Sequence, residues 1–261
     1  MQRILVVFLV PILLAADKPA TKEERIKKAR ADLQSSVVAT RLQAIGALVH
    51  SDISETLSSE MQALLKDADG KVREVAATAI GNHGVLAVPA VPDLLKQLAS
   101  DPVKEARETA ARALGRIGKA VPTERRALEP LRHAADKDAD PVTRTVALGA
   151  LAQMDEDVPG QIAALRKYLH HEEALVRMKA SHALGMIGLP AKAAAPEIVD
   201  VLKRETDAHR RGYVARALGN TGDPASLPAL YEALKNETDG GSMGEMRGAI
   251  TRLGGTVPAK K

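Results

Sequence analysis

The chain has 261 residues, of which 45% are hydrophobic and 27% are charged, as in an ordinary folded protein. Its net charge of +4 comes from 37 basic and 33 acidic residues mixed along the sequence, which argues against a nucleic-acid-binding surface. The absence of cysteine excludes disulfides, thiolate zinc sites and cysteine nucleophiles. Aromatic residues make up only 2%, so we expect a core of Ala, Leu, Ile and Val between closely packed helices.

The first residues have the pattern of a secretory signal peptide. A short basic start containing Arg3 precedes an apolar run from Ile4 to Ala16, which Pro11 interrupts. The run is shorter than the roughly 20 apolar residues that a membrane-spanning helix needs. We therefore expect a signal peptide over residues 1–16, a secreted or periplasmic protein and no membrane span after cleavage. An uncleaved anchor is the alternative interpretation. A disordered linker is expected over residues 17–21.

A short pattern then recurs along the chain. Arg73 is followed by Ala79 six positions later, by Ile80 at the seventh and by Gly81 at the eighth. The same spacing follows Arg107, Arg177 and Arg211, weaker copies follow Arg41 and Arg144, and a degenerate copy lies around Met246. Segments that often open with proline, such as 92–98, 196–202 and 228–234, separate these copies and carry an apolar stripe at helical spacing. Each repeat therefore predicts a first helix, a turn and a second helix.

The ends of the second helices carry capping residues. An aspartate at or before the start accepts hydrogen bonds from free backbone N–H groups and favours the positive end of the helix dipole. Glycine at the end permits the left-handed cap and tight turn that stop a helix. The expected N-terminal caps are Asp67, Asp101, Asp138 and Asp140, and the expected end glycines are Gly81, Gly115, Gly185 and Gly219, each followed three residues later by Gly84, Gly118, Gly188 and Gly222.

These segments resemble HEAT repeats, in particular the short bilin-lyase-like subtype with its Val-Arg-x-x-Ala-Ala-x-Ala-Leu-Gly signature. The resemblance implies an all-α fold, an α-solenoid of about seven helical hairpins over residues 22–254, with the second helices on the concave face. A disordered tail is expected over residues 255–261. Stacking is also what physics requires, because an isolated hairpin cannot bury its apolar stripe.

The repeat arginines flank the apolar stripe of the second helix. In HEAT proteins a similarly spaced Asp and Arg form a ladder between successive repeats, so the resemblance implies a structural role for these side chains. The corresponding residues here are Asp67, Arg73, Asp101, Arg107, Asp138, Arg144, Arg177 and Arg211. The expected acidic position holds His171 before Arg177 and Glu205 before Arg211, so we expect the ladder to weaken or re-pair there. A phosphate-binding row is the alternative interpretation of the arginines.

Because an α-helix has 3.6 residues per turn, the positions one, two and five after each repeat arginine lie on the side of the second helix that is opposite the core. They are mixed in charge, which is typical of a protein-binding groove and also of a solvated surface. The candidate binding residues are Glu74, Thr78, Glu108, Arg112, Thr145, Met178, His182, Tyr213 and Arg216. We expect the C-terminal half to carry the contact, because Tyr and Arg are favoured at interface hot spots.

The sequence does not contain the glycine-rich loop of a phosphate site or the paired histidines of a helical metal site. Every repeated glycine follows a helix, which is the wrong side for a phosphate loop. His171 and Glu172 form a single His–Glu pair, and His-Glu-x-x-His does not occur. We therefore expect a non-catalytic scaffold without cofactor or metal, which binds a protein partner and not nucleic acid. The alternatives are a lyase-like or metal-hydroxylase-like enzyme or enzyme subunit, and an electrostatic binder of acidic envelope polymers.

Overall fold

The computed structural model describes residues 20–49, 51–52 and 55–257. This part of the chain is entirely helical, with fourteen α-helices, several short 3-10 turns and no β-strand. The helices are α1 Lys22–Leu33, α2 Val38–Leu48, α3 Ser58–Ala63, α4 Gly70–Ile80, α5 Val91–Ser100, α6 Lys104–Ala120, α7 Leu128–Lys137, α8 Pro141–Gln153, α9 Val158–Tyr168, α10 Ala174–Ile187, α11 Ala195–Arg204, α12 Ala208–Thr221, α13 Leu227–Asn236 and α14 Gly240–Arg252.

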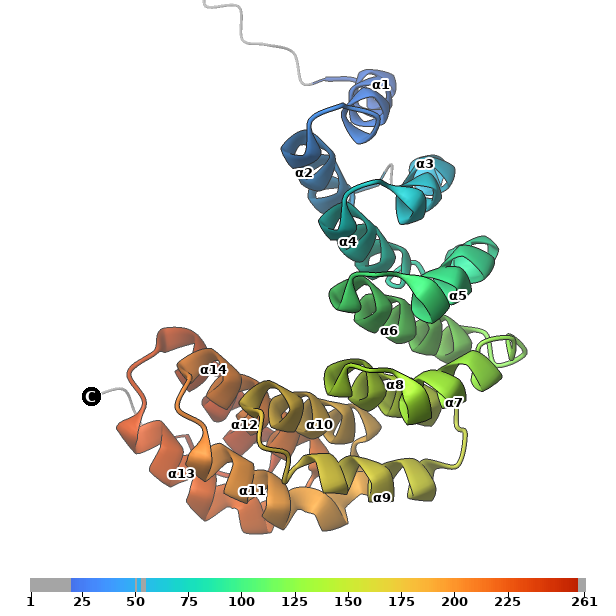
Figure 1. Cartoon of the computed structure of the whole chain (residues 1–261). Coiled ribbons are helices and arrows are strands. Elements are labelled where there is room, and N and C mark those ends of the chain that lie inside the picture. The colour runs from blue at the N-terminus through green and yellow to red at the C-terminus, as the bar shows by residue number, and fades with distance from the viewer. Residues whose placement is uncertain (1–19, 50, 53–54, 258–261) are drawn as a thin grey trace, which may run out of the picture.

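The helices form seven consecutive hairpins that stack into a curved α-solenoid, as the repeat pattern predicts (Figure 1). The even-numbered helices are the second helices of the hairpins and line the inner side of the curve. Each packs on the next, from α2 through α14. The odd-numbered helices lie on the outer side, and the array bends sharply near α8 (Figure 1). The inner helices therefore form one continuous concave face.

The N-terminal caps of the inner helices differ in part from the predicted ones. The capping carboxylate of α4 is Asp69, which accepts from the N–H groups of Lys71 and Val72, and Asp140 caps α8 as expected. Asp67, Asp101 and Asp138 lie two residues before the N-cap positions. Each accepts a hydrogen bond from the N–H two residues later, so these side chains shape the turn that leads into the helix.

The interpretation of Gly81, Gly115, Gly185 and Gly219 as left-handed caps is wrong. Gly81 has a right-handed φ of −60°, and Gly115 lies inside α6, which continues to Ala120. A Cβ on Gly115 would lie 2.7 Å from the Cα of Ala150, and the other three glycines face an alanine of the next inner helix equally closely. Glycine is therefore required there by helix-to-helix packing. Positive φ values occur at Gly84, Gly188 and Gly222, whereas Gly118 lies inside α6.

A ladder of ion pairs joins successive repeats. Arg73 pairs with Asp101, and Arg107 pairs with Asp138, each through two hydrogen bonds of 2.7–2.9 Å. Arg41 with Asp67 and Arg211 with Glu237 make the equivalent contacts. Each of these arginines also donates to the carbonyl six residues before it in its own repeat. One guanidinium thus ties the turn of its own repeat to the carboxylate of the next.

The ladder re-pairs at the bend, at the positions where the sequence departs from the pattern. Arg144 bonds the phenol oxygen of Tyr168 at 3.1 Å instead of a carboxylate, since His171 occupies the acidic position of the next repeat. Arg177 donates to the carbonyls of His171 and Glu172, while Glu205 pairs with Arg210. The buried core also divides here into two clusters, one from Leu33 to Met154 and one from Leu148 to Leu253.

The solenoid extends slightly beyond its expected bounds. Thr21 belongs to α1 as its N-cap and forms a capping box with Glu24, so the expected linker ends earlier. At the other end, Tyr231 donates to the carbonyl of Thr256, and Val257 packs against the core. The expected signal peptide, most of the expected linker and the rest of the expected tail fall on residues outside the described ones. Among the described helices, none is long and apolar enough to cross a membrane.

Candidate functional site

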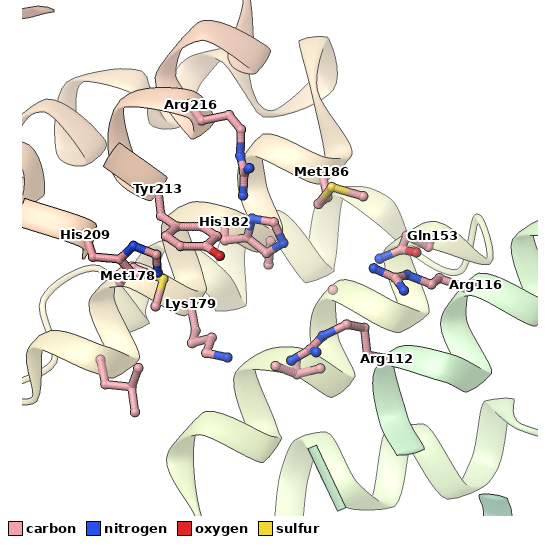
Figure 2. Close-up of a pocket in the computed structure, with 14 residues that line it drawn as sticks. Arg112, Arg116, Gln153, Met178, Lys179, His182, Met186, His209, Tyr213 and Arg216 are labelled. Atoms are coloured by element: carbon pink, nitrogen blue, oxygen red, sulfur yellow. The ribbon is translucent and has the colours of Figure 1, made fainter. Parts of the chain in front are cut away.

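The candidate binding residues all lie on inner helices, but only some of them meet. A cavity of about 450 Å³ opens on the concave face, where it is lined by residues of α6, α8, α10 and α12. It brings together five of the candidates, namely Arg112, Met178, His182, Tyr213 and Arg216 (Figure 2). Glu74 and Thr78 lie on α4, outside the cavity. The cavity therefore gathers the four favoured candidates of the C-terminal half, Met178, His182, Tyr213 and Arg216, together with Arg112 of α6.

The cavity is hollow where α8 carries a glycine. Gly149 takes the position that Arg112 holds in α6 and His182 holds in α10, and Val146 and Gln153 also line the cavity from α8. An ion pair between Glu108 of α6 and Lys179 of α10 spans α8. The sequence pattern places Thr145 on the open face, but the structure buries it completely and its hydroxyl donates to the carbonyl of Pro141. Met178 and Gly212, at the same position of the next two repeats, are buried as well, so this side of the inner helix faces its neighbour.

Tyr213 is the centre of an aromatic cluster in the cavity wall. Its ring meets the His209 ring edge-on, with centroids 4.9 Å apart, and the His182 ring at 6.1 Å. The Arg216 guanidinium carbon lies 4.6 Å from the Tyr213 centroid, which is a cation–π contact. Arg216 is also held by Glu245 at 3.2 Å. Tyr213 and Arg216 are therefore presented in a fixed arrangement before any ligand binds.

The charge of the cavity is positive. Arg112, Arg116, Lys179 and Arg216 line it, and none of its lining residues in the described part of the chain is acidic. Glu108 behind the wall pairs with both Arg112 and Lys179. Arg116 bonds the neutral side-chain oxygen of Asn82. Burial, followed by repulsion from Arg112, lowers the pKa of Arg116 from its ordinary value.

His182 is neutral at pH 7 in this setting. Burial is the main cause, and the positive charge of Arg216 adds to it, so that the pKa of His182 falls to about 4. The imidazole therefore contributes hydrogen-bonding capacity and ring surface to the cavity without adding a positive charge.

A proton NMR titration tests this assignment. We expect the His182 ring signals to shift with a pKa of about 4 in the wild-type protein. In Arg216→Gln the pKa should rise, because one of the charges that oppose protonation is gone. A wild-type pKa at or above the ordinary value of His, or one unchanged in the variant, would contradict this description of the cavity.

The candidate residues omitted nine of the fourteen lining residues, including Arg116, Gln153, Met186, Leu175 and His209. The first three lie nine positions after a repeat arginine, one helical turn beyond Arg112, Gly149 and His182. Residues four apart share a helix face, so this spacing was available as a signal. The prediction that the second helices end at the repeat glycines left these positions out. In the structure, α6 and α10 continue beyond Gly115 and Gly185.

The other histidines do not form a metal site in the described residues. Across that part of the chain, no group of three or more His, Asp and Glu side chains is arranged to hold a metal ion. The Nδ1 atom of His171 instead accepts a hydrogen bond from the N–H of Glu173 at 3.1 Å, in the turn before α10. What the concave cavity offers chemically is a preorganised set of cations, aromatic rings and apolar side chains.

Comparison with known families identifies the class. The model for HEAT repeats matches residues 59–152 and 128–212, and the model for the PBS lyase HEAT-like repeat matches residues 210–236. Together these matches cover more than half of the chain. The protein therefore belongs to the HEAT repeat family.

Solved structures share the fold. The complex of CpcE and CpcF of phycocyanin lyase from Nostoc sp. PCC7120 is similar, with a TM-score of 0.53 and 22% identity over 94% of this chain and 99% of that chain. Human deoxyhypusine hydroxylase gives a TM-score of 0.44 and 18% identity over 89% of this chain and 96% of that chain. No curated protein matches the sequence. At these identities the similarity establishes the α-solenoid fold alone.

Proposed function

We propose that this protein is an exported, non-catalytic scaffold, which binds a protein partner through the C-terminal half of its concave face. The observation that carries the proposal is the convergence of Tyr213, Arg216, His182, Met178 and Arg112 in one cavity. Tyr and Arg dominate the binding energy of many protein interfaces, and hot spots cluster in pockets of this kind.

Preorganisation supports the same proposal. Tyr213 is held by two histidine rings and by Arg216, which is itself fixed by Glu245. Side chains that are already ordered lose little conformational entropy on binding, which leaves more of the contact energy for affinity. The similar phycocyanin lyase structure is itself a complex of two different chains, CpcE and CpcF.

Affinity measurements on variants test the proposal once a partner has been captured by cross-linking in the producing cells. We expect Tyr213→Ala and Arg216→Ala each to weaken partner binding by about tenfold or more, as loss of a hot spot does. Calorimetry or surface plasmon resonance on the purified proteins provides the measurement.

Lys96→Ala is the matched control, because Lys96 is an exposed cation on the outer helix α5. It should change the affinity by less than about twofold, since it lies away from the concave face. Circular dichroism of each variant establishes that the solenoid is intact. If Tyr213→Ala and Arg216→Ala are folded and bind as tightly as the wild type, the proposed site is wrong.

A further inference from the structure

The concave cavity carries more positive charge than the surrounding protein neutralises. Four cations line it, and the ion pairs at its wall involve two carboxylates, Glu108 and Glu245. Arg116 has a neutral partner in Asn82, and its guanidinium faces the cavity beside Arg112 (Figure 2). A ligand that brings carboxylates would supply the missing counter-charge. Hydrogen bonds between carboxylate and guanidinium groups are also among the strongest in proteins.

The cavity is apolar as well as cationic. Val146, Leu175, Met178 and Met186 line it next to the Tyr213 ring. Leu175 and Met186 each remain 41% exposed, so the cavity is open to solvent at these side chains. Methionine adapts its shape to different apolar groups and is frequent on surfaces that bind peptides. The complementary ligand therefore combines a large aliphatic side chain with negative charge.

Carboxylates lie on the inner helices at both sides of the cavity cations. Glu74 lies on α4, Glu108 borders the cavity on α6, and Glu245 borders it on α14. A long polyanion that followed the groove would meet these carboxylates on either side of the cations, and like charges repel. A short acidic segment avoids them. This distribution favours a peptide over a charged polymer.

We propose that the cavity recognises an acidic–aliphatic segment of a protein partner. Carboxylates of the segment pair with Arg112, Arg116 and Arg216, and a leucine-like side chain between them enters beside Met178 and Met186. This inference rests on the proposed function, because it specifies the chemistry of the partner at the same site.

Synthetic peptides test the inference without knowledge of the natural partner. The probe is a fluorescein-labelled peptide with the core Asp-Glu-Leu-Leu-Asp-Glu between Gly-Ser flanks. One control replaces the acids by Asn and Gln, a second replaces both leucines by serine, and polyglutamate and inorganic polyphosphate serve as polymers. Fluorescence polarisation with the purified protein gives affinities, and ¹³C-methyl NMR of methionine reports on Met178 and Met186.

We expect the acidic–aliphatic probe to bind about tenfold or more tightly than either control peptide, and to shift the methyl signals of Met178 and Met186. Arg116→Gln and Arg216→Gln should each lower the affinity for the probe by about tenfold. Lys96→Gln on the outer face should change this affinity by less than about twofold. Thermal unfolding of each variant verifies that it is folded.

Three results would overturn the inference. They are equal affinity for the amide control, binding of the probe without a shift at either methionine, and tighter binding of a polymer that is lost between low and moderate salt. Failure here is distinguishable from failure of the proposed function. If the concave-face variants weaken binding of the natural partner but the acidic probe does not bind, the proposed interface is correct and only the proposed chemistry of the partner is wrong.

Discussion

Gly115→Ala is expected to lower the free energy of unfolding by about 2 kcal/mol, although alanine is the better helix former. The new Cβ would lie 2.7 Å from both the Cα and the Cβ of Ala150, so α6 and α8 must move apart along their contact. Backbone cannot rotate away as a flexible side chain does, and overpacking of this kind typically costs about 1–3 kcal/mol. Urea unfolding followed by circular dichroism provides the measurement.

Gly46→Ala is the matched control, with the same chemical change in an exposed helical position. No atom of a neighbouring element lies within 4 Å of the Cβ that it adds to α2. The same change should therefore raise the free energy of unfolding by about 0.5–1 kcal/mol, through helix propensity alone. Opposite signs at the two sites are the result expected from the packing. A stabilising Gly115→Ala would mean that α6 and α8 do not approach as closely as described.

Arg107→Ala should destabilise the protein by about 3 kcal/mol, because it leaves the Asp138 carboxylate without its counter-ion. The two side chains are 16% and 7% exposed, so the remaining carboxylate is largely hidden from water. Asp138 retains the N–H of Asp140 as a donor, which keeps the loss below that of a wholly unpaired buried charge. Urea unfolding again measures the difference.

The comparison variant is Arg144→Ala, in which the lost side-chain partner is the Tyr168 phenol and not a carboxylate. Its expected cost is about 1.5 kcal/mol, at the low end for a hydrogen bond from a charged donor to a neutral acceptor. Arg107→Ala/Asp138→Asn should recover part of the loss from Arg107→Ala, because it removes the orphaned charge. Equal costs for Arg107→Ala and Arg144→Ala, with no recovery in the double variant, would show that the ladder carboxylates contribute nothing.

Much of the fold could be predicted because the residue pattern of each repeat indicates which side of its helices is buried. The spacing of Ala79 and Ile80 after Arg73 marks the buried side of α4, and its recurrence predicts the stack. The acidic positions also indicate where the ladder continues. At Glu237 a hydrogen bond from Arg211 lowers the pKa of the carboxyl to about 2, as expected of a ladder partner. His171 marks the place where the ladder re-pairs, close to the bend.

The role of the repeat glycines could not be read from one repeat, because it depends on the next. Gly115 faces Ala150, which lies six residues after Arg144, and Gly185 faces Ala217, which lies six after Arg211. Glycine at a helix end and glycine at a helix crossing look alike in a single sequence segment. The pairing of glycine with alanine in successive repeats distinguishes them, and it would also have indicated the additional helical turn that carries Arg116 and Met186.

The site was predicted in part for the same reason. Helical periodicity identified the inner face, including Tyr213 and Arg216, but it treats every repeat as equivalent. The hollow lies where α8 carries Gly149 while its neighbours carry Arg112 and His182 at the same position, and where the array bends. Thr145 is buried at a repeat position that periodicity alone places on the open face. Such differences between repeats depend on how the helices assemble into the curved solenoid. The periodicity of a single helix does not predict them.

Photo-cross-linking in the producing cells tests the proposed binding face most directly. A benzophenone amino acid at position 186 would stand at the mouth of the cavity, where Met186 is 41% exposed, and one at position 96 would stand on the outer helix α5. Adducts to a single partner protein from position 186, with none from position 96, are the predicted result. The same partner captured from position 96 and not from position 186 would contradict the assignment of the concave cavity as the binding site.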